Sequence, residues 1–141
     1  MKKITLFVVA VLSTFMAMTQ VLKETEVPAQ VKNALHKKFP DLGQVSWEKE
    51  KSNYEANWGG KSGEDHAALF TPSGDFLEIV HAIPVKDLPA TIAPYIKIHF
   101  GGATIREAGK ISFANGREGY EVEIKGKDLL FDKQGKYLGV D

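Results

Sequence analysis

Hydrophobic residues recur at every fourth position near the start of the chain. Val31, Leu35 and Phe39 have the spacing that lines one face of a helix. Pro28 precedes them, where a helix has no use for an amide hydrogen, and Pro40 follows them, where it stops a helix. The pattern predicts a helix between these two prolines.

The same spacing returns later in the chain. Ile92, Ile96 and Phe100 predict a second helix that starts at Pro89. Pro94 lies within this pattern, and an interior proline breaks or bends a helix. We therefore expect the second helix to be short or bent.

After each helix the hydrophobic period changes from about 3.6 residues to 2, which is typical of strands. Residues Tyr120–Ile124 alternate without interruption, and Asn115-Gly116 is a strong signal for a two-residue hairpin turn. That turn would set Lys110 opposite Glu121. The predicted strands are residues 44–50, 54–58, 66–71 and 75–83 after the first helix, and 111–113, 120–124, 129–131 and 136–140 after the second.

The two helix-plus-strand segments are copies of one unit. A shift of 61 residues superposes Val27-Pro28-Ala29 on Leu88-Pro89-Ala90, and it also aligns the hydrophobic positions of the two helices. Near the copies' ends it aligns Phe70 with Phe131 and Gly74 with Gly135. The sequence thus predicts an α+β protein made of a tandem repeat, each repeat a helix plus a four-stranded antiparallel sheet. The repeats are residues 20–86 and 87–141, and we expect them to fold together because each is small for an independent core.

The N-terminal segment is typical of a secretory signal peptide rather than of the fold. Lys2 and Lys3 precede a nine-residue apolar run, Ile4–Leu12, and a more polar stretch follows. We assign residues 1–19 to this signal, and the protein to the periplasm or the secreted fraction. The alternative is an uncleaved membrane anchor over Ile4–Leu22, which would be the chain's only attachment to a membrane.

Composition excludes several kinds of function. The chain has 18 basic and 18 acidic residues, so it lacks the basic excess of a nucleic-acid-binding protein. It contains no cysteine, which excludes disulfides, thiolate metal sites and cysteine nucleophiles.

The sequence resembles the PepSY-like family of exported proteins, whose members are similar in fold to the beta-lactamase inhibitor protein. The resemblance covers nearly all of residues 26–141. It implies an exported, non-catalytic module that binds or inhibits another protein, but it transfers no inhibitory residues, because no defined inhibitory motif is present. The residues that carry it are Val27-Pro28, Phe39-Pro40, Val45–Lys49, Tyr54–Ala56, Leu88-Pro89, Tyr120–Val122, Asp128–Asp132 and Gly135.

No residue pattern predicts catalysis, a metal site or a cofactor. The four histidines lack the spacings of metal ligands, and Glu64-Asp65-His66 is better explained as a loop that enters a strand. Trp47 and Trp58 alternate in phase with apolar neighbours, which favours the core over a ligand platform.

The first predicted hairpin suggests a binding surface. A turn at Lys51-Ser52 places Glu48 opposite Glu55 on the side away from the helices, and like charges so placed are destabilising. A lysine from an adjacent strand, or water and salt, would explain this acidic pair without a function. The alternative is that Glu48, Glu50, Glu55 and Asn57 form the docking surface for a cationic partner.

Three classes of function remain open at this point. The first is a protein-binding or inhibitor-like module of the cell envelope, and the second is a binder or sensor of a small ligand or envelope component. An enzyme is the third, although no nucleophile, base or metal-ligand set supports it. The partner in the first case would be another envelope or secreted protein.

We predict that the mature protein begins between residues 18 and 23, because cleavage follows the apolar run of a signal peptide. Intact-mass measurement or N-terminal sequencing of protein recovered from the envelope would check this. Retention of Met1 would instead support the anchor.

Overall fold

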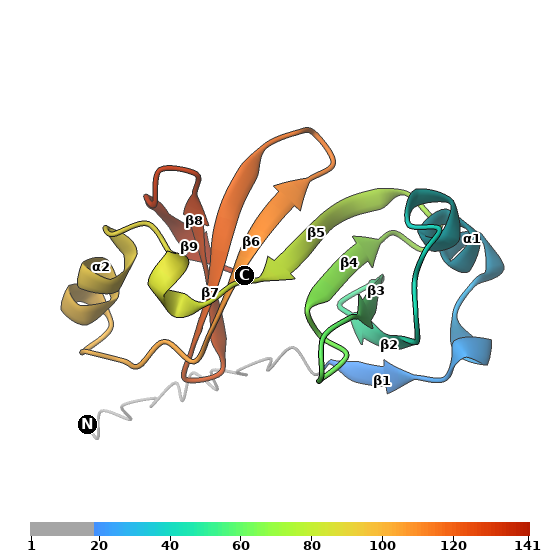
Figure 1. Cartoon of the computed structure of the whole chain (residues 1–141), viewed down its shortest axis with the longest axis horizontal. Helices are drawn as coiled ribbons and strands as arrows, with labels where there is room; N and C mark the ends of the chain where they lie inside the picture. The colour runs from blue at the N-terminus through green and yellow to red at the C-terminus, as the bar shows by residue number, and fades with distance from the viewer. Residues whose placement is uncertain (1–18) are drawn as a thin grey trace, which may run out of the picture.

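The computed structural model describes residues 19–141, so the predicted signal segment lies almost entirely outside the described residues. The described chain is an α+β protein with one antiparallel sheet of nine strands, each paired with the next along the sequence. Two halves lie side by side and meet where β5 pairs with β6 (Figure 1). The strands are β1 (Gln20–Leu22), β2 (Val45–Glu50), β3 (Asn53–Trp58), β4 (His66–Phe70), β5 (Phe76–Ala82), β6 (Glu107–Phe113), β7 (Glu118–Ile124), β8 (Lys127–Asp132) and β9 (Tyr137–Val140).

Eight of these strands match the prediction, and β1 is an addition to it. β1 pairs with β2 through Gln20 and Lys49, Val21 and Glu48, and Leu22 and Trp47. Three residues are too few to show an alternating pattern, so this strand could not be predicted from the sequence. Because β1 begins at Gln20, signal cleavage before that residue would leave the sheet whole.

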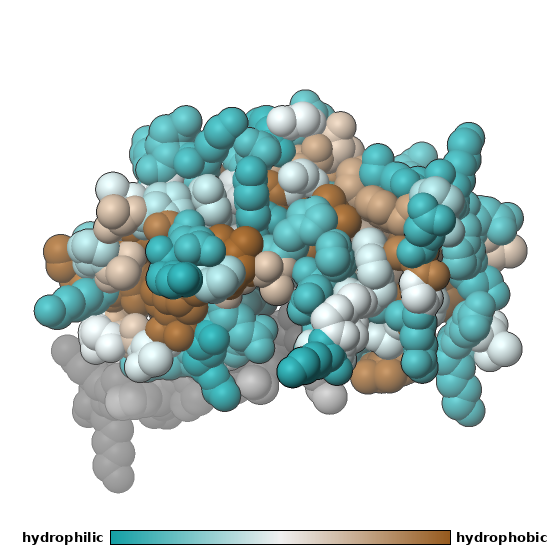
Figure 2. Space-filling model, viewed as in Figure 1, coloured by the Kyte–Doolittle hydropathy of each residue, from teal (hydrophilic) through white to brown (hydrophobic). Residues whose placement is uncertain are grey.

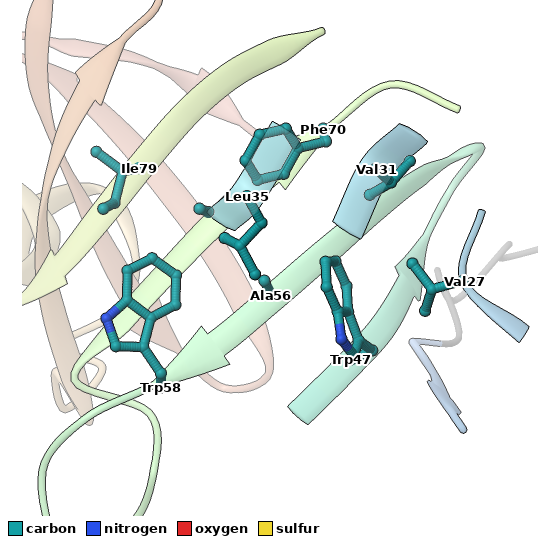
Figure 3. Close-up of a cluster of buried hydrophobic side chains, with 9 residues drawn as sticks. Val27, Val31, Leu35, Trp47, Ala56, Trp58, Phe70 and Ile79 are labelled. Atoms are coloured by element: carbon teal, nitrogen blue, oxygen red, sulfur yellow. The ribbon is translucent and has the colours of Figure 1, made fainter. Parts of the chain in front are cut away.

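Helix α1 (Ala29–Lys38) packs on the first half of the sheet as predicted. Val31 and Leu35 are fully buried, and Figure 3 shows Leu35 next to Ala56, with Trp58 on one side and Trp47 and Val31 on the other. Both tryptophans belong to this core, so their prediction as core residues is confirmed. Short 3-10 helices precede α1 (Glu24–Glu26) and α2 (Val85–Asp87).

Helix α2 (Ile92–His99) covers the second half with a separate core. It has eight residues against ten in α1, so the prediction of a short helix is confirmed. Pro94 is its third residue, and the first turn of a helix needs no amide hydrogen. The helix therefore begins at Ile92 rather than at Pro89, although the Pro89 carbonyl still accepts a hydrogen bond from the Ile92 amide (3.1 Å).

Similar contacts join each helix to a turn of its own half. The Gln30 side chain donates to the Pro72 carbonyl (3.1 Å), and the Thr91 hydroxyl donates to the Gly135 carbonyl (3.2 Å). Gly74 and Gly135 have positive φ (92° and 82°), and a Cβ atom on either would collide with the helix start. The two positions are 61 residues apart, as the sequence shift requires.

The β6–β7 hairpin differs from its prediction by one residue. Its loop has three residues, Ala114 to Gly116, closed by a bond from the Phe113 amide to the Arg117 carbonyl (2.9 Å). Gly116 takes the left-handed conformation (φ 84°) that such a loop requires. A shift of one residue changes the face of every side chain in a strand.

The predicted pairing of Lys110 with Glu121 is therefore wrong. Lys110 lies opposite Tyr120 on the helix side and forms an ion pair with Glu118 (3.1 Å). Glu121 lies opposite Gly109 on the other side, away from that lysine.

Both helices lie on the same face of the sheet. Directly paired residues of antiparallel strands have their side chains on the same face of the sheet. Successive pairs connect Trp47, Ala56, Ala68 and Ile79 of the first core, and Ile79 pairs in turn with a residue of β6 in the second half. The opposite face is left without helical cover. None of the helices in the described residues is long and apolar enough to cross a membrane.

We predict that Leu35→Ala and Ile96→Ala each lower the free energy of unfolding by about 2–5 kcal/mol, because both side chains are almost fully buried. Urea denaturation followed by circular dichroism would measure the change. Losses below about 0.5 kcal/mol at both positions would contradict the assignment of these helix faces to the cores.

Candidate functional site

The uncovered face of the sheet forms a hollow of about 740 Å³. Its lining contains eleven acidic residues and two basic ones, although the whole chain has equal numbers of each. In the space-filling view, hydrophilic residues cover most of the visible surface and hydrophobic ones show mainly beside α2 (Figure 2). The acidic residues of the hollow are Glu48, Glu50, Glu55, Glu64, Asp65, Glu78, Glu107, Glu121, Glu123, Asp128 and Asp141, and the basic ones are Lys51 and Arg106.

The four residues singled out in the sequence all line this hollow. The β2–β3 register is the predicted one, with Glu48 opposite Glu55 and Glu50 opposite Asn53. Asn57 is buried and donates its side-chain amide to the Glu55 carboxylate (3.0 Å).

No lysine from an adjacent strand separates the two glutamates. Val21 of β1 flanks Glu48, and Leu69 of β4 flanks Glu55. Leu69 pairs in turn with Glu78 of β5, so Glu48, Glu55 and Glu78 lie in one row across the sheet. A lysine on an adjacent strand is therefore not what neutralises the acidic pair, which leaves water and salt as the explanation without a function.

Burial and mutual repulsion favour the protonated form of three carboxyl groups in the hollow, those of Glu50, Glu55 and Glu78. Burial, followed by the charge of Glu55, raises the pKa of Glu50 to about 7. Burial also raises the pKa of Glu55, against the lowering effect of its bond from Asn57. Burial raises the pKa of Glu78 to about 7, with Asp141 and Glu50 adding to the shift.

The second half contributes carboxyl groups to the hollow that were not predicted from the sequence to lie near the first half. Glu107, Glu123 and Asp128 lie side by side on β6, β7 and β8. Burial, followed by the charge of Asp128, raises the pKa of Glu121 to about 8. The alternation of Tyr120–Ile124 already placed Glu121 and Glu123 on the wet face, but the curvature that turns them toward the first half has no signal in the sequence.

Lys51 is the link between the halves at this site. Its ammonium nitrogen lies 3.0 Å from the Asp141 carboxylate, across 90 positions of the chain. The bond to Asp141 raises the pKa of Lys51, so the ammonium keeps its charge throughout the neutral range.

Of the Glu64-Asp65-His66 segment, Glu64 and Asp65 line the hollow and His66 does not. His66 begins β4 as predicted, stacked on Trp58 and edge-on to His81. Asp132 accepts the amides of Gln134 and Lys136, which makes its segment a turn. Among residues 19–141, no three or more histidine, cysteine, aspartate or glutamate side chains are placed so that they could hold a metal ion together.

We predict that the protein becomes less stable as pH rises from about 5 to 8. Glu50, Glu78 and Glu121 keep their protons to about pH 7 or 8 when folded and to about 4.5 when unfolded. The folded state therefore binds more protons in this window, and its free energy of unfolding falls by about 1–3 kcal/mol as the pH rises. Urea denaturation at both ends of the window would measure the fall.

Glu121→Gln provides the control for this prediction, because it removes the charge without removing the side chain's bulk. We expect it to flatten the pH profile and to stabilise the protein at about pH 8. Burial lowers the pKa of His81, so this histidine makes the stability rise with pH. Because His81 is present in both proteins, its contribution cancels when the pH profile of the variant is subtracted from that of the unaltered protein. A stability that rises toward pH 8 and is unaffected by the substitution would contradict the prediction.

Comparison with solved structures identifies proteins of the same fold. A BLIP-like protein from Bacteroides fragilis is 18% identical, with a TM-score of 0.57 over 81% of this chain and 84% of its own. A protein from Bacteroides eggerthii, described as a "putative periplasmic" protein, is 19% identical, with a TM-score of 0.64 over 82% of this chain and 88% of its own.

Comparison with curated proteins finds no match. The family model described as "Putative beta-lactamase-inhibitor-like, PepSY-like" matches residues 59–138, which is more than half of the chain. The resemblance in the sequence is thereby confirmed, and the chain belongs to this PepSY-like, beta-lactamase-inhibitor-like family.

Proposed function

We propose that this protein is an exported, non-catalytic binding module whose acidic hollow receives a cationic segment of another envelope protein. The observation that carries the proposal is the concentration of eleven acidic and two basic residues in one hollow of a chain with balanced charge. A hollow with unneutralised carboxylates attracts a basic partner and repels acidic ones, which favours specificity and fast association.

The row formed by Glu48, Glu55 and Glu78 supports this function. Directly opposed like charges lower the stability of a sheet, and no ion pair of the described residues neutralises the three groups. A cationic side chain from a partner would remove this repulsion on binding. The binding energy therefore includes relief of a cost that the free protein bears.

A small cationic ligand is the second candidate, because the volume of the hollow suits one. Pockets for small molecules are mostly apolar with a few polar groups, however, whereas half of the residues that line this hollow are charged. The composition resembles the charged surface of a protein interface more closely, and we therefore favour a protein partner.

Export supports an envelope location for the partner. The N-terminal segment has the order of a signal peptide, and a protein of the same fold from Bacteroides eggerthii is described as "putative periplasmic". We place this protein in the periplasm or the secreted fraction on these grounds.

We predict that Glu48→Gln combined with Glu55→Gln leaves the protein folded, or slightly more stable, and weakens binding of a cationic partner. Pentalysine is a suitable probe, and calorimetry at low salt should show an affinity loss of about five- to tenfold. The loss should shrink at high salt, where the charges are screened.

The matched control is Glu24→Gln combined with Asp41→Asn, which removes two exposed acidic charges outside the hollow. This variant should bind pentalysine like the unaltered protein. If the hollow variant binds as tightly as the control at low salt, this face does not bind the partner.

A further inference from the structure

The two halves of the protein approach each other at one end of the acidic hollow. The β2–β3 turn of the first half reaches the end of the chain through the ion pair between Lys51 and Asp141. The C-terminus lies between the halves in Figure 1. The main connection between the halves is the β5–β6 ladder, which has five residue pairs from Glu78 and Phe113 to Ala82 and Gly109.

Carboxyl groups from both halves face this hollow and act on one another. Glu50 and Glu78 come from the first half, and both raise the pKa of Glu121 in the second. Asp141 likewise acts on Glu50 and Glu78. When these groups are ionised, their repulsion opposes the approach of the halves, while the ion pair of Lys51 favours it.

We propose that the hollow opens and closes with proton uptake. When the carboxyl groups are protonated, the Lys51–Asp141 ion pair holds the halves together, and when they ionise, repulsion separates the halves by flexing the β5–β6 ladder. This device needs no partner, so it does not depend on the proposed function.

The balance of forces in the hollow supports this device. An exposed ion pair such as Lys51–Asp141 contributes little by itself, about 0–1 kcal/mol, so it holds the halves only while the opposing repulsion is small. The charged groups that face the hollow are Glu48 and Glu50 of β2, Lys51 of the turn, Glu55 of β3, Glu64 and Asp65 before β4, Glu78 of β5, Arg106 before β6, Glu107 of β6, Glu121 and Glu123 of β7, Asp128 of β8 and Asp141 after β9.

The change falls close to neutral pH. The carboxyl groups of Glu50 and Glu78, with pKa values of about 7, and of Glu121, with a pKa of about 8, lose their protons there. Because the Lys51 ammonium stays charged over the same range, acidification removes repulsion without weakening the cationic side of the ion pair. The closed form is therefore the one favoured at lower pH.

Distance measurement between the rims of the hollow tests the proposal. The chain has no cysteine, so Ser52→Cys in the β2–β3 turn and Lys127→Cys at the start of β8 provide unique positions for nitroxide labels. Double electron–electron resonance should show a distribution several ångströms longer at about pH 8.5 than at about pH 5.5. High salt should reduce the difference, because it screens the repulsion.

Two further variants in the labelled protein separate the parts of the device. Glu78→Gln with Glu121→Gln should remain closed at about pH 8.5, whereas the control Glu24→Gln with Asp41→Asn should still open. Lys51→Gln removes the ion pair that holds the closed form, so it should lengthen the distance at about pH 5.5.

An unchanged distance between the two pH values in the labelled protein with no other substitution would overturn the proposal. A full shift that persists in the Glu78→Gln, Glu121→Gln variant would overturn it as well. If the distance shifts with pH but pentalysine does not bind, the proposed function fails and this inference stands.

Discussion

The alternation of side chains across a single antiparallel meander is the constraint on which the rest of the structure depends. Every strand pairs with its neighbour in sequence, so the face of each residue is fixed by the register of eight successive pairings. Both helices cover one face, and each builds a core there from its own half. The polar residues of the alternating pattern therefore collect on the other face, where the curvature of the sheet turns them toward one another.

This arrangement concentrates negative charge on one face, although the numbers of acidic and basic residues in the chain are equal. A chain with 18 acidic and 18 basic residues has eleven of its acidic residues in one hollow. The basic residues lie mainly elsewhere, as Lys110 and Lys133 do when they both contact Glu118 on the opposite face. The two cores stabilise the fold against the repulsion in the hollow, because burying Leu35 or Ile96 contributes more free energy than the repulsion within one pair of opposed carboxylates costs.

The sequence predicts the parts of this structure that local patterns determine. The helices follow from four-residue spacing, and the β2–β3 register follows from a two-residue turn at Lys51-Ser52 that keeps Trp47 and Ala56 on one side. The β6–β7 register differs from its prediction because Asn115-Gly116 suits a three-residue loop as well as a two-residue turn. In the structure Gly116, with its positive φ, is the last residue of a three-residue loop. The meeting of Glu50 and Glu78 with Glu121 depends on the curvature of nine strands, which no local pattern encodes.

The repeated design allows the demands of folding to be separated from those of function. Folding requires small or flexible residues at equivalent turns, and Gly74 and Gly135 meet that requirement in the same way in both halves. It requires only alternation on the uncovered face, which neutral polar residues would satisfy without repulsion. Yet in each half two glutamates lie directly opposite each other on neighbouring strands of that face. They are Glu48 and Glu55 in the first half and Glu107 and Glu123 in the second. Because this pairing destabilises the sheet in both halves, its explanation lies in what the hollow binds or in how it responds to protons.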